Sequence, residues 1–291
     1  MSLDTERTNA VAGHLPPPGR AGWRRARWSG WLGVWGPPAA VLAVVVGLWY
    51  GVSYLLLAPE RRFLVPPPHT VVQVGFLDPD NLAELLAGLL LSARVAITGL
   101  AIAVIVGVSV AVAMSQARWI ERSLYPYAVA LQTIPILALV PLFGFWFGFG
   151  LLSRVLVCVL IALFPIIANT LFGLQSVERG FHDLFAVHGA NRLTRLRKLQ
   201  LPAALPSIFT GLRIAAGASV IGAIVGDLFF KQGQPGIGVL IDLYRARLQS
   251  EQLVAAVLLS SLFGIAVFWS FGLLTRWVIP WHPSARDPTA P

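Results

Sequence analysis

The stretch VAITGLAIAVIVGVSVAVAMSQA (residues 95–117) decides the fold class of this chain. It lies between Arg94 and Arg118 and contains no Asp, Glu, Lys or Arg. A helix needs about 20 predominantly apolar residues to cross roughly 30 Å of hydrocarbon, so this stretch predicts a membrane span. Four more stretches lack these four residue types and are long enough to span: residues 28–59, 123–153, 155–177 and 252–275.

A sixth stretch, residues 206–226, is apolar except for Arg213. Arg213 stands about two helical turns in, close enough for its long side chain to reach toward the nearer interface. We therefore expect an all-α membrane protein with six transmembrane helices. Residues 58–87 form the loop after the first span, with a short surface helix expected over residues 81–86.

The composition excludes several other classes of protein. Of 291 residues, 56% are hydrophobic and 12% are charged, about half the charged fraction typical of soluble domains. Disordered chains are charged and poor in aromatic residues, so disorder is excluded as well. Cys158 is the one cysteine, which excludes an internal disulfide and a multi-cysteine metal site.

The distribution of basic residues predicts the orientation of the chain. With the N-terminus in the cytoplasm, 15 of the 22 Lys and Arg residues lie on the inner side and 7 on the outer side. Cytoplasmic loops carry the excess of positive charge, so both termini are expected on the cytoplasmic side of the cell membrane. The net charge of +9 then reflects this bias and indicates no nucleic-acid partner. The expected organisation is a basic, disordered tail (1–30), a six-span transmembrane domain (31–281) and a second cytoplasmic tail (282–291).

The cytoplasmic segment 178–205 carries the most informative pattern. Asp183 opens a short predicted helix in which Leu184, Phe185 and His188 share one face. Gly189 ends this helix, because glycine readily takes a positive φ. Asn191 is expected to cap a second short helix that begins at Arg192 and extends to residue 199, and Leu201-Pro202 then turns the chain back into the membrane. Such a loop either lies among lipid headgroups or docks a soluble partner.

The sequence contains no recognisable catalytic or nucleotide-binding site. The two lysines, Lys198 and Lys231, are followed by Leu199 and Gln232, so neither forms the Gly-Lys-Ser/Thr of a phosphate-binding loop. The histidines form no His-Glu-x-x-His zinc motif. The chain is therefore not expected to be an enzyme or to hold a cofactor or metal itself.

The loop closely resembles the signature loop of permeases of binding-protein-dependent ABC importers. The resemblance rests on Asp183 through Gly189, Leu201-Pro202 and Gly211-Leu212-Arg213, and it covers roughly residues 85–275. Further matches are Thr133-Ile134-Pro135, Trp146-Phe147-Gly148, Phe164-Pro165, Asn169-Thr170 and Gly236-Ile237-Gly238. The nearest branch comprises nitrate, sulfonate and taurine permeases, together with permeases for thiamine-pyrimidine and riboflavin precursors. Asp183 replaces the usual glutamate, and Leu184-Phe185 replace two alanines.

The resemblance implies a type I importer permease fold with cytoplasmic coupling helices. It also implies a homodimer, a separate ATPase subunit that uses ATP and Mg²⁺, and an external binding protein that delivers a small solute. The loop residues expected to contact the ATPase are Asp183, Leu184, Phe185, His188, Gly189, Asn191, Arg192, Leu201 and Pro202. The alternative is a secondary transporter that works alone and is driven by ions.

Polar groups within the spans are candidates for the solute pathway or its gate, because they are costly in lipid unless they face protein or water. These candidates are Gln132, Thr133, Asn169, Thr170, Asp227 and Arg94. For the threonines, a hydrogen bond to their own helix is the simpler interpretation. Asp227 is expected to pair with Lys231, one helical turn further on.

Overall fold

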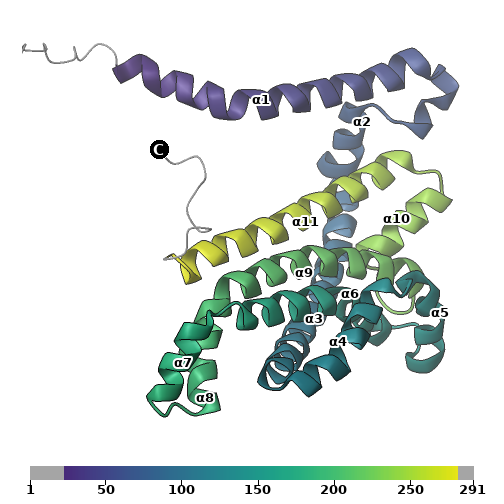
Figure 1. Cartoon of the computed structure of the whole chain (residues 1–291). Helices are drawn as coiled ribbons and strands as arrows, with labels where there is room; N and C mark the ends of the chain where they lie inside the picture. The colour runs from purple at the N-terminus through teal and green to yellow at the C-terminus, as the bar shows by residue number, and fades with distance from the viewer. Residues whose placement is uncertain (1–22, 281–291) are drawn as a thin grey trace, which may run out of the picture. The chain divides into compact units, whose positions relative to one another are not determined.

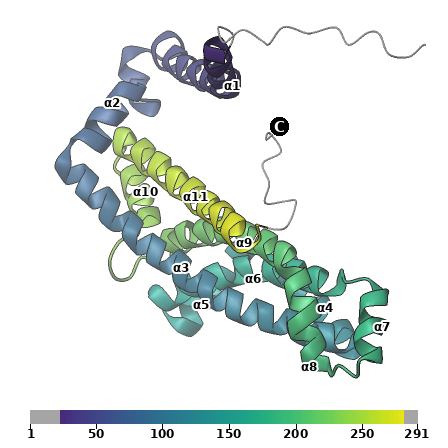
Figure 2. The same cartoon turned by 90° about the vertical axis from the view of Figure 1, so that its left-hand side faces the viewer.

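The computed structural model describes residues 23–280, and all regular structure in this range is helical (Figures 1 and 2). The chain divides at Ala58 into two bodies, and each is described by itself. The first contains α1 (Trp23–Gly51), with Pro37 and Pro38 inside the helix, followed by a π-helical turn (Val52–Leu56). The apolar part of this body, Trp35–Leu56, is long enough to cross a membrane, as the sequence predicted.

The second body begins at Pro59 and contains all remaining elements. A 3-10 helix (Pro59–Leu64), α2 (Pro68–Val72) and a π-helical turn (Gln73–Leu77) lead into the long helix α3 (Pro79–Gln116). The elements that follow are α4 (Arg118–Thr133), α5 (Ile136–Phe147), α6 (Leu151–Gln175), α7 (Arg179–Val187), α8 (Arg192–Arg195), a π-helical turn (Leu196–Gln200), α9 (Leu201–Phe229), α10 (Ile237–Ala246) and α11 (Ser250–Val278).

The separate short helix expected over residues 81–86 is wrong, because α3 begins at Pro79 and runs without a break through the second span. Asp78 caps this helix: its Oδ1 accepts hydrogen bonds from the backbone N–H groups of Asp80 (3.0 Å) and Asn81 (3.5 Å). Proline suits the first turn, where its missing N–H costs nothing. With no breaker before Gln116, the helix continues past Glu84 and Arg94.

The stretch 123–153, predicted to form one span, holds two helices that together are long and apolar enough to cross a membrane once. The helices α4 and α5 are joined at Ile134–Pro135 with a bend of 99°. Pro135 has no N–H and disfavours helical backbone in the residue before it, so the chain leaves the helix at Ile134. The structure thus has five single helices that could cross a membrane among the described residues, and six spans if the bent pair counts as one.

The core of the second body is formed by α3, α6 and α9. Small side chains bring the three helices together: Ala96, Cys158 and Ala223 share one buried cluster, and Ala103, Ala162 and Ala216 share the next. Helices in membranes associate through such small residues, which let the backbones approach closely. At one end of this core lie α7 and α8, and at the opposite end lies α10 (Figures 1 and 2).

Candidate functional site

The first candidate region is the docking hairpin, defined here as α7, the turn at Gly189 and α8. Gly189 has a φ of +68°, a conformation that strongly favours glycine. The backbone N–H of Gly189 donates to the carbonyl of Ala186 (3.0 Å), and that of Ala190 donates to Phe185 (2.9 Å). These bonds close the end of α7, so the predicted role of Gly189 as the helix terminator is confirmed.

Asn191 caps α8 as the sequence predicted. Its side-chain Oδ1 accepts a hydrogen bond from the backbone N–H of Thr194 (2.8 Å). The predicted separate helix over residues 192–199 is wrong, however, because the chain stays helical from Arg192 to Phe229. The π-helical turn Leu196–Gln200 widens the helix just before Pro202, which is how a helix accommodates a proline ring without breaking. The hairpin is therefore built directly onto a membrane span.

The docking hairpin exposes an apolar surface. Leu184 and Phe181 are each 52% exposed, and Val187 is 85% exposed. The His188 side chain folds back against α7 and places Nδ1 2.9 Å from the carbonyl oxygen of Leu184. Phe185 is half-buried, while Asp183, Arg192 and Pro202 are exposed and Leu201 is partly covered. Exposed apolar patches with a charged rim mark interaction surfaces. Phe181 and Val187 belong to this patch and were missed by the sequence analysis.

The second candidate region is the ionic cluster of Ser92, Arg154 and Asp227, at the far end of the same body. Arg154 is 1% exposed and Asp227 is 0% exposed. Arg154 Nη1 donates to Asp227 Oδ1 (3.1 Å), and the Ser92 hydroxyl donates to Asp227 Oδ2 (2.5 Å). The cluster joins α6, α9 and α3, which supply one of these residues each.

Arg154 also organises the loop after α9. Its Nε donates to the carbonyl of Phe230 (2.7 Å), Nη2 to that of Gln232 (3.1 Å) and Nη1 to that of Gln234 (3.3 Å). The guanidinium thereby satisfies the carbonyls of a chain segment that leaves its helix. A buried charge needs this full set of partners to offset its lost hydration.

The expected pair of Asp227 and Lys231 is wrong. Helix α9 ends at Phe229, so Lys231 does not follow Asp227 along a helix, and its ammonium contacts Asp242 instead. Arg154 takes the place expected of Lys231. Arg154 separates the uncharged stretches 123–153 and 155–177 and is one of the seven basic residues predicted on the outer side. In the structure it lies in the first turn of α6 and is buried. Nothing local signals this pair, because 73 residues separate its members.

The glycines of Gly236-Ile237-Gly238 allow α10 to start against the ionic cluster. A Cβ on Gly236 would lie 2.1 Å from Asp227 Oδ2, and one on Gly238 would lie 2.3 Å from the carbonyl oxygen of Ile224. The backbone N–H of Ile237 donates to the Ser92 hydroxyl oxygen (2.8 Å). Glycine is therefore needed at both positions of the motif, because a Cβ would clash there.

Gly236→Ala should destabilise the protein by about 1–3 kcal/mol, because the added methyl group displaces Asp227 from its partners. The measurement is the thermal unfolding of the purified chain in detergent. Gly150→Ala is the matched control, since a Cβ there meets nothing within 4 Å. Equal unfolding temperatures for the two variants would contradict the prediction.

Asp242 offers a pH-dependent contact outside the spans. Hydrogen bonds from Lys231 and Arg245 lower the pKa of this carboxyl below its ordinary value. The stabilisation is therefore present above the unfolded pKa of about 3.9 and is lost as the pH falls through the lower folded value. We expect a small drop in the unfolding temperature in this acidic range. Asp242→Asn should remove the acidic drop in unfolding temperature. The same pH dependence in this variant as in the wild type would contradict the role given to Asp242.

The predicted pathway residues lie apart from one another. Arg94, Gln132 and Thr133 are exposed, on α3 and at the end of α4. Thr133 Oγ1 donates to the carbonyl of Ala130 (2.9 Å), and Asn169 Nδ2 donates to that of Pro165 (2.8 Å). Thr170 is buried, and its Oγ1 has no hydrogen-bond partner among the described residues. Only Asp227 belongs to the ionic cluster, so the pathway roles of the others stay predictions.

Comparisons with known proteins identify the family of the chain. Residues 92–280 match the family described as the inner membrane component of binding-protein-dependent transport systems. The formylaminopyrimidine transport permease ThiX of Halalkalibacterium halodurans is 36% identical over 76% of this chain and 87% of its own length.

Two further relatives are also named as permeases. The riboflavin transport system permease RibX of Chloroflexus aurantiacus is 36% identical over 57% of this chain and 62% of its own length. The taurine permease TauC of Escherichia coli is 28% identical over 83% of this chain and 88% of its own length.

The match to the family begins at Ser92 within α3 and extends through α11, the region that holds both candidate sites. Its members are transport permeases of the inner membrane, as the loop pattern implied, and ATP hydrolysis resides in a separate subunit. This chain therefore belongs to the inner membrane components of binding-protein-dependent transport systems and is an ABC importer permease.

Proposed function

We propose that this permease forms a homodimer whose two docking hairpins each bind an ATPase subunit. The observation that carries the proposal is the continuous helix from Arg192 to Phe229. It joins the exposed apolar hairpin at one end to Asp227 at the other, about 53 Å further along the helix at 1.5 Å per residue. A movement of the hairpin can thus pass along one continuous helix to the ionic cluster.

The nucleotide chemistry belongs to the partner in this proposal. ATP and Mg²⁺ bind the ATPase subunit, and this chain supplies no ligand to either. ATP can shift the permease only if the ATPase binds two permease states with different affinity. The hairpin is the part of the permease that such a difference would act on, since its apolar face is available to a partner. Both termini lie in the cytoplasm in this arrangement, on the side of the hairpin.

The solute is proposed to be a small heterocycle delivered by an external binding protein. The relatives named for formylaminopyrimidine and riboflavin are each 36% identical to this chain, against 34%, 32% and 28% for relatives named for aliphatic sulfonates, nitrate and taurine. A nitrate-, sulfonate- or taurine-like anion is the other candidate class. Uptake of labelled solute by the reconstituted importer, in competition with unlabelled pyrimidines or sulfonates, distinguishes the two classes.

Leu184→Glu tests the docking hairpin. Burying a carboxylate against an apolar groove is costly, so the ATPase should no longer co-purify with the permease, while the permease itself remains folded. Leu248→Glu is the matched control: Leu248 is also exposed, at the opposite end of the body between α10 and α11. Retention of the ATPase by Leu184→Glu would contradict the proposal. Uphill uptake by the permease alone, abolished by ionophores, would instead support an ion-driven transporter.

A further inference from the structure

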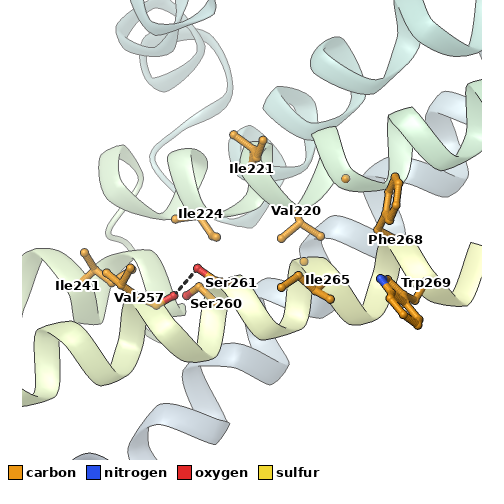
Figure 3. Close-up of a pocket in the computed structure, with 12 residues that line it drawn as sticks. Val220, Ile221, Ile224, Ile241, Val257, Ser260, Ser261, Ile265, Phe268 and Trp269 are labelled. Atoms are coloured by element: carbon orange, nitrogen blue, oxygen red, sulfur yellow. Dashed lines mark hydrogen bonds between the residues drawn. The ribbon is translucent and has the colours of Figure 1, made fainter. Parts of the chain in front are cut away.

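An apolar groove of about 560 Å³ runs between α9 and α11, with Ile241 of α10 at one end (Figure 3). Its polar side chains are already engaged: Ser260 Oγ donates to Ala256 (2.7 Å) and Ser261 Oγ to Val257 (2.8 Å). Two glycines keep it open. A Cβ on Gly217 would meet nothing within 4 Å, and one on Gly264 would meet only Val220 Cγ1 at 3.8 Å. The groove therefore suits a hydrocarbon chain.

A positive charge lies beside the other end of the groove. Phe268 lines this end, and the Cζ atom of Arg213 lies 3.9 Å from the centroid of its ring. Arg213 Nε is buried without a hydrogen-bond partner, and no described residue forms an ion pair with this arginine. Gly272, one helical turn beyond Phe268, leaves room for the guanidinium. The cation–π contact orients Arg213 but leaves its charge unneutralised.

The length of the groove matches one leaflet of a bilayer. Its lining on α11 extends from Val257 to Trp269, about 18 Å at 1.5 Å per residue. One leaflet of a 30 Å hydrocarbon core is about 15 Å deep. An acyl chain that lies in the groove thus brings its headgroup to the level of Arg213. A guanidinium binds phosphate through paired, charge-assisted hydrogen bonds.

We propose that this groove binds an acyl chain of an anionic phospholipid, with the lipid phosphate on Arg213. Basic sites between transmembrane helices are known to hold lipid headgroups. The lipid would bridge α9 and α11, and α9 is the helix that continues from the docking hairpin. The headgroup lies in the cytoplasmic leaflet if the orientation given under the proposed function holds. The binding of the lipid does not depend on that orientation.

The test uses the full chain purified in detergent and titrated with phosphatidylglycerol, with bound lipids counted by native mass spectrometry. One phosphatidylglycerol per chain is expected to bind the wild type. Arg213→Gln should weaken its binding about tenfold, the range for a lost hydrogen bond to a charged group. Gly264→Leu fills the groove and should abolish binding. Ile221→Trp, which replaces an exposed groove residue, fills it from α9 if the glycine variant does not fold.

Arg122→Gln is the control, because Arg122 is an exposed arginine on α4 and does not line the groove. Equal lipid binding by Arg122→Gln, Arg213→Gln and a folded groove-filling variant would overturn the proposal. So would a groove-filling variant that breaks a permease dimer without changing the bound lipid, since a second copy would then cover the groove. The measurement needs no ATPase or solute, so its failure is distinct from failure of the proposed transport function.

Discussion

Arg154→Met is expected to produce the largest loss of stability of any single substitution considered for this chain. Methionine fills a similar volume but leaves Asp227 buried without its cationic partner. It also leaves the carbonyls of Phe230, Gln232 and Gln234 without the donors they have now. Removing one partner from a buried ion pair costs about 3–5 kcal/mol, which is a large share of the stability of a typical domain.

The double variant Arg154→Met/Asp227→Leu separates the two causes. Replacing both charges removes the uncompensated carboxylate, so the double variant should be more stable than Arg154→Met alone. It should not reach the wild type, because the three loop carbonyls stay without donors. The measurement is the rate of thermal unfolding in detergent at a fixed temperature, with folded protein counted by size-exclusion chromatography.

Lys231→Met is the control for the loss of an arginine or lysine at this end of the molecule. The Lys231 side chain is 54% exposed in its contact with Asp242, so its removal should change little. If Arg154→Met unfolds no faster than Lys231→Met, the ionic cluster does not hold α3, α6 and α9 together.

Gly189→Val is expected to abolish ATP-coupled uptake while leaving membrane insertion and the stability of the second body intact. The φ of +68° at this position is strained for any side chain and most strained for a β-branched one. A Cβ there would meet nothing within 4 Å, so backbone strain alone changes the angle between α7 and α8. About 1–3 kcal/mol of strain corresponds to a roughly 5- to 150-fold lower population of the native angle between α7 and α8.

Gly189→Asn provides the graded comparison, because asparagine takes positive φ more readily than other non-glycine residues. Its uptake should fall between wild type and Gly189→Val. The measurement is ATP-driven uptake in proteoliposomes that hold the permease and its ATPase, with permease content determined in parallel. Normal uptake by Gly189→Val would show that the angle between α7 and α8 has no role in coupling ATP to uptake.

The amino-acid sequence alone determined the fold class, the spans and the chemistry of the hairpin turn. These features depend on residues close together in the chain: uncharged stretches between arginines, a glycine after α7, and Asn191 two residues later. Hydrophobic length and turn chemistry act over a few residues, so they are legible before any tertiary contact forms.

Only the tertiary structure decided which charges meet and which helices are continuous. Asp227 lies close to Lys231 in sequence but pairs with Arg154, because packing of α6 against α9 brings the arginine to it while the chain turns away after Phe229. Pro135 breaks its span, whereas Pro202 does not interrupt the helix from Arg192 to Phe229. Whether a proline breaks a helix depends on whether the surrounding helix can adjust to its missing N–H and its ring. Which distant charges pair depends on helix packing, so the local sequence pattern fixes neither.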